Sequence, residues 1–136
     1  MNVLQVNERL RVLIVDDEPL AADTLALILN QRGFDATAVY SGETAVEAAK
    51  VLKPNVLISD VCMLGMTGIE AAVRIWQNLP NCKVILISGQ AADAELFHCA
   101  EVEGLEFELL DRPVHPTVFL DRLGGHATSL GFNRNR

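Results

Sequence analysis

Three aspartates follow two short apolar runs of the chain. Asp16 and Asp17 come directly after residues 12–15, and Asp60 follows residues 56–58, at an interval that fits one βαβ unit. If both runs are parallel strands, the three carboxylates meet at one edge of a sheet. Carboxylates gathered this closely repel one another and raise each other's pKa, so such a cluster is tolerated mainly when a cation offsets the charge. The sequence therefore predicts a metal-dependent acidic site.

Two further polar residues follow apolar runs in the same way. Ser88 ends the run over 84–88, and Arg112 comes after the run over 107–110, immediately before Pro113. Ligands of open parallel sheets bind outside the carboxyl ends of the strands. Alone, each residue would be read as a turn, a cap or a surface charge. Together, two acidic positions, a hydroxyl and a cation at one edge predict a single binding site.

The elements that must position these residues alternate along the chain. Apolar runs typical of strands lie at 11–15, 36–40, 56–59, 84–88 and 107–110, and helical patterns lie between them. Strands that alternate with helices predict parallel crossovers and a doubly wound α/β fold.

Five helices are expected, and most have clear end signals. Pro19 suits the first turn of a helix that Gly33 ends, Ser41 caps one that reaches about residue 52, and Thr67 with Glu70 forms a capping box for one that Pro80 closes. A fourth helix is expected over 93–103. A fifth is expected over 116–123, followed by an aperiodic tail from residue 124.

Composition sets limits on the kind of protein this is. A chain of 136 residues suits one domain, and a net charge of -7 argues against direct nucleic-acid binding. Its three cysteines lack metal-type spacing, so reduced and mostly buried thiols are expected. No apolar run is long enough to span a membrane, and no secretory leader is evident. We therefore expect a soluble cytoplasmic protein that does not contact a membrane.

The chain resembles the receiver domain of two-component response regulators, of the stand-alone type related to chemotaxis regulators. The stretches that carry the resemblance are VLIVDDEP, LISDVCMLGMTGIE, VILISGQ and LLDRP. It implies a flavodoxin-like (βα)5 fold with a five-stranded parallel sheet in the order 2-1-3-4-5. Residues 1–10 would be an N-terminal extension, 11–123 the receiver domain, and 124–136 a flexible C-terminal tail or the start of a linker.

The resemblance also implies roles for individual residues. Asp60 would accept a phosphoryl group from a histidine kinase, a phosphotransfer protein or a small phosphodonor. Asp16, Asp17 and Asp60 would hold Mg²⁺ or Mn²⁺, with the backbone carbonyl of Cys62 as a further ligand. Oxygen ligands of this kind are those that Mg²⁺ prefers.

Ser88 and Arg112 would contact the transferred phosphoryl group. Such a protein catalyses only its own phosphorylation and dephosphorylation, so it is not an enzyme with an outside substrate. It would signal by binding a downstream protein that the sequence does not identify, and a homodimer is possible.

Three positions depart from the family pattern. Arg112 replaces the usual Lys before a proline whose peptide bond is expected to be cis, and Leu109 replaces an aromatic residue that swings inward on activation. Leu64 stands where a Pro is common, which should loosen the loop after Asp60. Phosphoryl chemistry is therefore more strongly indicated than the usual switch.

Three other functions are compatible with parts of the pattern. A degenerate receiver would bind its partner without phosphorylation. An Mg²⁺-dependent aspartyl phosphatase would also use a nucleophilic Asp, but it normally has a second Asp where this chain has Cys62. A flavodoxin-like electron carrier is disfavoured because the acidic residues after the first strand would repel a flavin phosphate.

Overall fold

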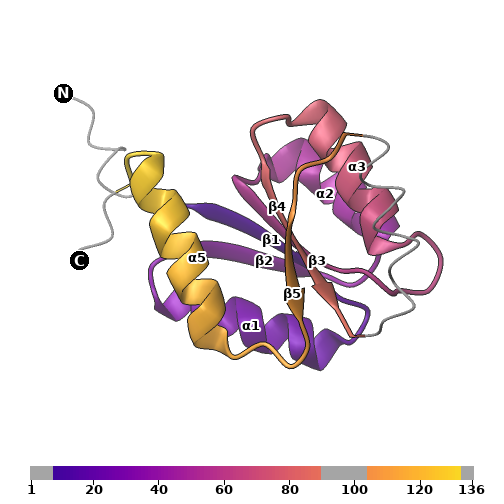
Figure 1. The fold of residues 1–136 in the computed structure, drawn as a ribbon, viewed down its shortest axis with the longest axis horizontal. Helices are drawn as coiled ribbons and strands as arrows, with labels where there is room; N and C mark the ends of the chain where they lie inside the picture. Colours follow the sequence, from indigo (N-terminus) through magenta and orange to yellow (C-terminus); the bar gives the residue numbers. More distant parts are fainter. Residues whose placement is uncertain (1–7, 90–103, 133–136) are drawn as a thin grey trace.

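The computed structural model describes residues 8–89 and 104–132. A five-stranded sheet forms the middle layer, with α1 (Pro19–Gln31) and α5 (Pro116–Ser129) on one face. Helices α2 (Gly42–Leu52) and α3 (Gly68–Asn78) cover the other face (Figure 1). The doubly wound α/β fold predicted from the alternating pattern is confirmed.

All strand pairs in the sheet are parallel, and the strand order is β2-β1-β3-β4-β5. This is the order 2-1-3-4-5 that the resemblance implied. The strands are β1 (Arg11–Val15), β2 (Asp35–Val39), β3 (Val56–Asp60), β4 (Lys83–Ser88) and β5 (Glu108–Asp111). Each agrees with its expected position to within one residue at either end. Because all five run the same way, their carboxyl ends share one edge.

The helix starts follow the local signals in the sequence. Pro19 occupies the first turn of α1, and the Ser41 hydroxyl accepts the Thr44 N–H at the start of α2. Both halves of the capping box between Thr67 and Glu70 are formed at α3. Such caps satisfy N–H groups that have no partner within the helix.

The core consists of two apolar layers, one on each face of the sheet. Strand residues alternate between the faces, so Leu13 and Leu57 pack under α2 and α3, whereas Ile14 and Ile58 pack under α1 and α5. The central strand β3 is buried along its whole length. Continuous aliphatic strands of this kind are expected where both faces of a parallel sheet are covered.

The prediction of a flexible tail from residue 124 is wrong for residues 124–129, which continue α5. Leu123 and Ala127 are four residues apart, lie on the same side of the helix, and are fully buried. The Phe132 N–H donates to the Ala127 carbonyl, and the Phe132 side chain packs against the same core layer. Tertiary packing therefore outweighs the low helix propensity of Gly124 and Gly125.

Other sequence expectations fall partly outside the described residues. The helix expected over 93–103 and the thiol of Cys99 lie there. Of the other two cysteines, Cys82 is buried but Cys62 is exposed, so the expectation of mostly buried thiols holds for only one of them. Within the described parts of the chain, no helix is long and apolar enough to cross a membrane.

The packing of Ala127 gives a test of the extended helix. Ala127→Asp would place an unpaired carboxylate in the core beneath α5, so we expect the free energy of unfolding to fall by about 3 kcal/mol or more. Thr128→Asp is the matched control, because it adds the same charge at the adjacent, exposed position. Urea denaturation of both variants measures the difference, and equal stabilities would contradict a packed helix end.

Candidate functional site

The carboxyl edge of the sheet gathers the polar residues that the sequence singled out. Asp16 and Asp17 follow β1, Asp60 ends β3, and Ser88 ends β4 beside Asp111 of β5. Arg112 follows directly, and its N–H donates to the Ser88 carbonyl at 2.9 Å. Parallel pairing brings these strand ends together from positions far apart in the chain.

Three carboxylates form a compact cluster at this edge. One carboxylate oxygen from each of Asp16, Asp17 and Asp60 lies within 4.8 Å of the others. Asp16 and Asp60 are 7% and 8% exposed, and Asp17 is half-buried. A set of hard oxygen donors with access from solvent suits Mg²⁺, which keeps several waters when bound to protein carboxylates. The donor set therefore fits the divalent cation expected from the sequence.

Arg112 supplies the positive charge within this cluster. Its Nη2 atom lies 2.9 Å from Asp60 Oδ1 and 3.4 Å from Asp16 Oδ2, so one nitrogen pairs with two of the three carboxylates. The peptide bond between Arg112 and Pro113 is cis, as expected. The Glu18 N–H donates to the other Asp16 oxygen at 3.0 Å, which fixes that side chain at the start of α1.

The electrostatic balance at Asp60 is unfavourable to its charge. Burial raises the pKa of the Asp60 carboxyl, the Arg112 guanidinium opposes that change, and the charges of Asp16 and Asp17 raise the pKa further. Burial is the largest of these effects, so the net result is a raised pKa. The ionised Asp60 is therefore less favoured in the folded protein than in the unfolded chain.

The loop between β3 and α3 is held by two acidic side chains. The Leu64 N–H donates to Asp17 Oδ2 at 3.3 Å, and the Met66 N–H donates to Glu43 Oε2 at 3.2 Å. A proline at position 64 has no N–H and could not make the first bond. The leucine that was expected to loosen this loop thus brings an additional anchor to it. Cys62 lies in the same loop, two residues after Asp60.

Gly68, the first residue of α3, allows that helix to approach the end of β3. A Cβ atom at position 68 would lie 1.8 Å from the Asp60 carbonyl oxygen and 2.7 Å from Ser59 Oγ. The Gly68 N–H donates to the Val61 carbonyl at 3.0 Å. Our sequence reasoning assigned no role to Gly68 or Glu43. A glycine directly after the helix cap Thr67 was the available signal for a close backbone contact.

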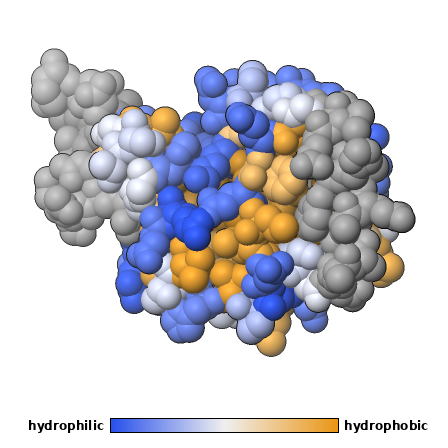
Figure 2. Space-filling view, in the orientation of Figure 1, coloured by the Kyte–Doolittle hydropathy of each residue, from blue (hydrophilic) through white to orange (hydrophobic). Residues whose placement is uncertain are grey.

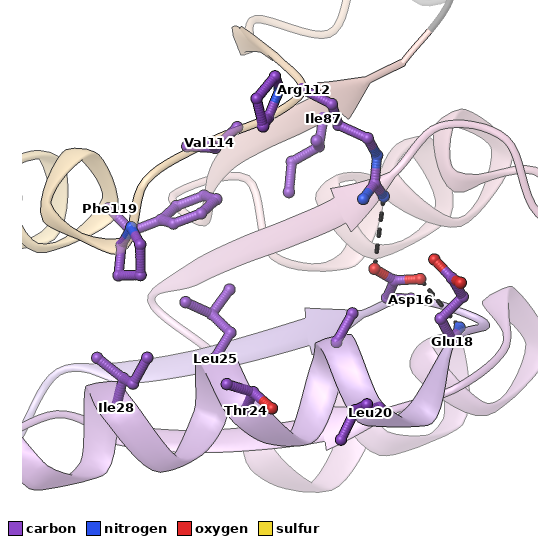
Figure 3. A pocket seen from close by; sticks show the side chains of 13 residues that line it. Asp16, Glu18, Leu20, Thr24, Leu25, Ile28, Ile87, Arg112, Val114 and Phe119 are labelled. Carbon is purple, nitrogen blue, oxygen red and sulfur yellow. Dashed lines mark hydrogen bonds and ion pairs between the residues drawn. The ribbon is translucent and has the colours of Figure 1, made fainter.

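An apolar groove of about 550 Å³ opens beside Arg112. Figure 3 shows Leu25 and Ile28 of α1 along one side and Val114 and Phe119, before and within α5, along the other. The ion pair between Arg112 and Asp16 closes one end of the groove. Apolar surface therefore adjoins the charged cluster.

Comparison with known protein families matches residues 12–123 to the response regulator receiver domain. The chain belongs to this family. It is 32% identical over 114 residues to the chemotaxis protein CheY of Thermotoga maritima. The aligned segment covers 83% of this chain and 93% of that protein. The crystal structure of a CheY-like receiver domain from Methanospirillum hungatei superposes on this structure with a TM-score of 0.81. The match covers 90% of this chain and 96% of the other chain at 21% sequence identity, so it shows a shared fold.

Receiver domains also occur as parts of larger proteins. The chain is 34% identical over 95 residues to the autoinducer 1 sensor kinase/phosphatase LuxN of Vibrio campbellii, a match over 70% of this chain and 11% of that protein. Membership of this family makes the chain a receiver domain of two-component phosphorelay systems.

Leu109 lies on the edge strand β5, whose outer side has no partner among the described strands. Leu109 is 41% exposed. The space-filling view shows apolar surface in the centre of the face on which β5 lies (Figure 2). Leu109 is thus an exposed aliphatic side chain at the position where the resemblance implied an aromatic residue.

The close approach at Gly68 predicts a large effect for one methyl group. Gly68→Ala would force α3 away from Asp60, so we expect the free energy of unfolding to fall by about 2 kcal/mol or more, as for overpacked cores. Gly125→Ala is the control, since a Cβ there meets nothing within 4 Å, and an alanine in a helix stabilises by up to about 1 kcal/mol. Chemical denaturation measures the free energy of unfolding of both variants. If neither substitution changes it, the close contact between Gly68 and the Asp60 carbonyl is disproved.

The raised pKa of Asp60 predicts that its charge reduces stability. In metal-free buffer, Asp60→Asn should have a higher melting temperature than the wild type at neutral pH. The folded state binds the Asp60 proton more readily than the unfolded state does, so the difference should shrink as the pH falls towards about 4. Asp35→Asn, at an exposed position, is the control. Melting curves across this pH range measure the difference in melting temperature. An Asp60→Asn variant that melts below the wild type at neutral pH would refute the prediction.

Proposed function

We propose that this receiver accepts a phosphoryl group on Asp60 in a reaction that requires Mg²⁺ or Mn²⁺. The observation that carries the proposal is the position of the Asp60 carboxylate, beside Asp16 and Asp17 and 2.9 Å from the Arg112 guanidinium. A nucleophile with acidic neighbours and a fixed cation suits phosphoryl transfer, in which positioning and charge neutralisation supply most of the catalysis.

In the proposed reaction, an Asp60 oxygen attacks the phosphorus atom of the donor. A bond forms between this oxygen and phosphorus, and the bond from phosphorus to the donor's nitrogen or oxygen breaks with its electron pair leaving on the donor. The product is an acyl phosphate. A divalent cation held by the three carboxylates would supply positive charge for the oxygens of the transferring group.

Arg112 and Ser88 would act on the phosphoryl group once it arrives. Arg112 already contacts Asp60 and can turn its remaining N–H donors to phosphoryl oxygens, which guanidinium groups bind well. Ser88 ends the neighbouring strand and supplies a hydroxyl. A hydrogen bond from this hydroxyl to a phosphoryl oxygen would change the contacts at the end of β4, so that a local charge alters the surface.

The partners follow from the same chemistry. The phosphodonor would be a histidine kinase or phosphotransfer protein, or a small acyl phosphate, and a further protein would read the phosphorylated surface. The apolar groove beside Arg112 supports a protein donor, because a partner seated over it would lie next to the cluster. We place the reaction in the cytoplasm, with no turnover of an outside substrate.

A degenerate receiver that binds its partner without phosphorylation is the second candidate. The exposed aliphatic Leu109 favours it, because this side chain has neither a ring that could swing inward nor a hydroxyl. A phosphatase is not favoured, because Cys62 provides no carboxyl group two residues after Asp60.

Intact-mass measurement after incubation with acetyl phosphate and MgCl₂ tests the proposal. We expect the wild type to gain the mass of one phosphoryl group, and Asp60→Asn to gain none. Asp35→Asn, which alters an exposed carboxylate at the amino end of β2, should be phosphorylated like the wild type. An unchanged wild-type mass would leave the degenerate receiver, and an adduct retained in Asp60→Asn would place the acceptor elsewhere.

A further inference from the structure

The loop between β3 and α3 begins next to the proposed phosphorylation site. It consists of residues 61–67 and follows Asp60 directly. Backbone bonds fix both of its ends, since the Val61 N–H donates to the Ile87 carbonyl and the Gly68 N–H donates to the Val61 carbonyl, each at 3.0 Å. The middle of the loop is held differently, by acidic side chains from two other elements.

Glu43 of α2 is one of these side chains. Its Oε2 atom accepts the Met66 N–H at 3.2 Å. The loop turns at Gly65, whose φ of +76° is one that residues with a side chain rarely adopt. A Cβ atom at position 65 would lie 3.2 Å from the same carboxylate oxygen. The glycine therefore lets Glu43 lie directly against the turn, beside two successive residues of the loop.

The start of α2 is packed equally closely against the loop. A Cβ atom at position 42, the first residue of α2, would lie 3.0 Å from the Met66 Cβ, Cγ and carbonyl oxygen. Gly42 is buried, and the Ser41 hydroxyl caps the helix by accepting the Thr44 N–H. The Glu43 carboxylate thus extends from a fixed backbone, and Met66 has little room to shift towards the helix.

Asp17 connects the same loop to the acidic cluster. The Leu64 N–H donates to Asp17 Oδ2 at 3.3 Å, two residues before the bond to Glu43. Asp17 is one of the three carboxylates proposed to hold the cation, whereas Glu43 is not part of that cluster. A shift of the loop would disturb both Asp17 and the Cys62 carbonyl, the further proposed ligand. Glu43 can therefore act on the cation site through the loop, without being a ligand itself.

We propose that Glu43 is a positioning residue, which holds the β3–α3 loop where Asp17 and the Cys62 carbonyl can bind the divalent cation. This inference rests on the proposed function, which requires that cation. An acidic residue in the first turn also stabilises a helix through its charge alone. The two roles have different requirements. The helix responds to negative charge, whereas the loop needs an acceptor atom that reaches the Met66 N–H.

Three substitutions separate the charge of Glu43 from its hydrogen bond. Glu43→Gln removes the charge but keeps a side-chain oxygen at the same reach, Glu43→Asp keeps the charge but is one methylene shorter, and Glu43→Ala removes both. The free Mn²⁺ signal in electron paramagnetic resonance gives the dissociation constant of each variant without any phosphodonor. We expect Glu43→Asp and Glu43→Ala to bind Mn²⁺ about fivefold more weakly than the wild type, as for one lost hydrogen bond. Glu43→Gln should stay within about twofold, because the charge it removes is exposed to solvent.

Amide hydrogen exchange of Met66, followed by nuclear magnetic resonance, reports on the loop directly. We expect faster exchange in Glu43→Asp and Glu43→Ala and the wild-type rate in Glu43→Gln, because only the first two variants leave the Met66 N–H without its acceptor. Glu47→Ala is the matched control. It removes an exposed carboxylate one turn further along α2, where Glu47 pairs with Lys50, and should change neither measurement. Circular dichroism establishes that each variant is folded, and if Glu43→Ala is not, Glu43→Asp against Glu43→Gln decides.

The possible outcomes distinguish the two proposals. If Glu43→Gln and Glu43→Ala bind Mn²⁺ equally weakly and Glu43→Asp binds it like the wild type, charge alone is responsible and the positioning role is overturned. Unchanged Mn²⁺ affinity in Glu43→Ala overturns it too, whatever the exchange rate of Met66. In both cases a wild type that binds Mn²⁺ and is phosphorylated by acetyl phosphate leaves the proposed function intact. A wild type that does neither overturns both proposals.

Discussion

Mutual repulsion of three carboxylates is the constraint on which the rest of the site depends. The fold holds Asp16, Asp17 and Asp60 close together at a largely buried edge, although their proximity makes the folded state less stable. The ion pair of Arg112 with Asp60 and Asp16 offsets part of this cost. Such pairs keep their strength when buried only if the geometry is good, and here a single guanidinium nitrogen serves both partners. Arg112 therefore neutralises the charge of the cluster only in part.

The structure around the carboxylates is closely packed, and this packing holds them together despite their repulsion. β3 is buried throughout and lies between β1 and β4, so Asp60 has a fixed backbone. The loop that follows is anchored by Asp17 and Glu43, and α3 packs against the Asp60 carbonyl through Gly68. Aliphatic packing on both faces of the sheet supplies the stability that the acidic edge reduces. Unfavourable local energies of this kind are characteristic of functional sites, where a ligand later relieves them.

Sequence reasoning succeeded where the determinants are local or periodic. The strands, the capped starts of α2 and α3, and the five polar side chains at one edge all follow from short patterns. It failed at residues 124–129, where glycines indicate a tail but packing of Ala127 maintains the helix. Nor could it find the bond from Leu64 to Asp17 or the contact at Gly68, which depend on how closely two elements approach. The pairing of Arg112 with two carboxylates likewise depends on where β1, β3 and β5 end in space.

The position of Arg112 also bears on how a signal could leave the site without the usual aromatic residue. Arg112 is bonded through its backbone to Ser88, and the next residue, Pro113, lines the groove that continues to α5. A change in the partners of its guanidinium therefore occurs directly beside the segment that leads into that helix. Leu109 lies on the same strand, but an aliphatic side chain has no preferred polar partner that could distinguish two states. Arg112 pairs with two of the three carboxylates and adjoins the segment that leads into α5, so a response of the surface to the proposed phosphorylation is more simply traced through Arg112 and the start of α5 than through Leu109.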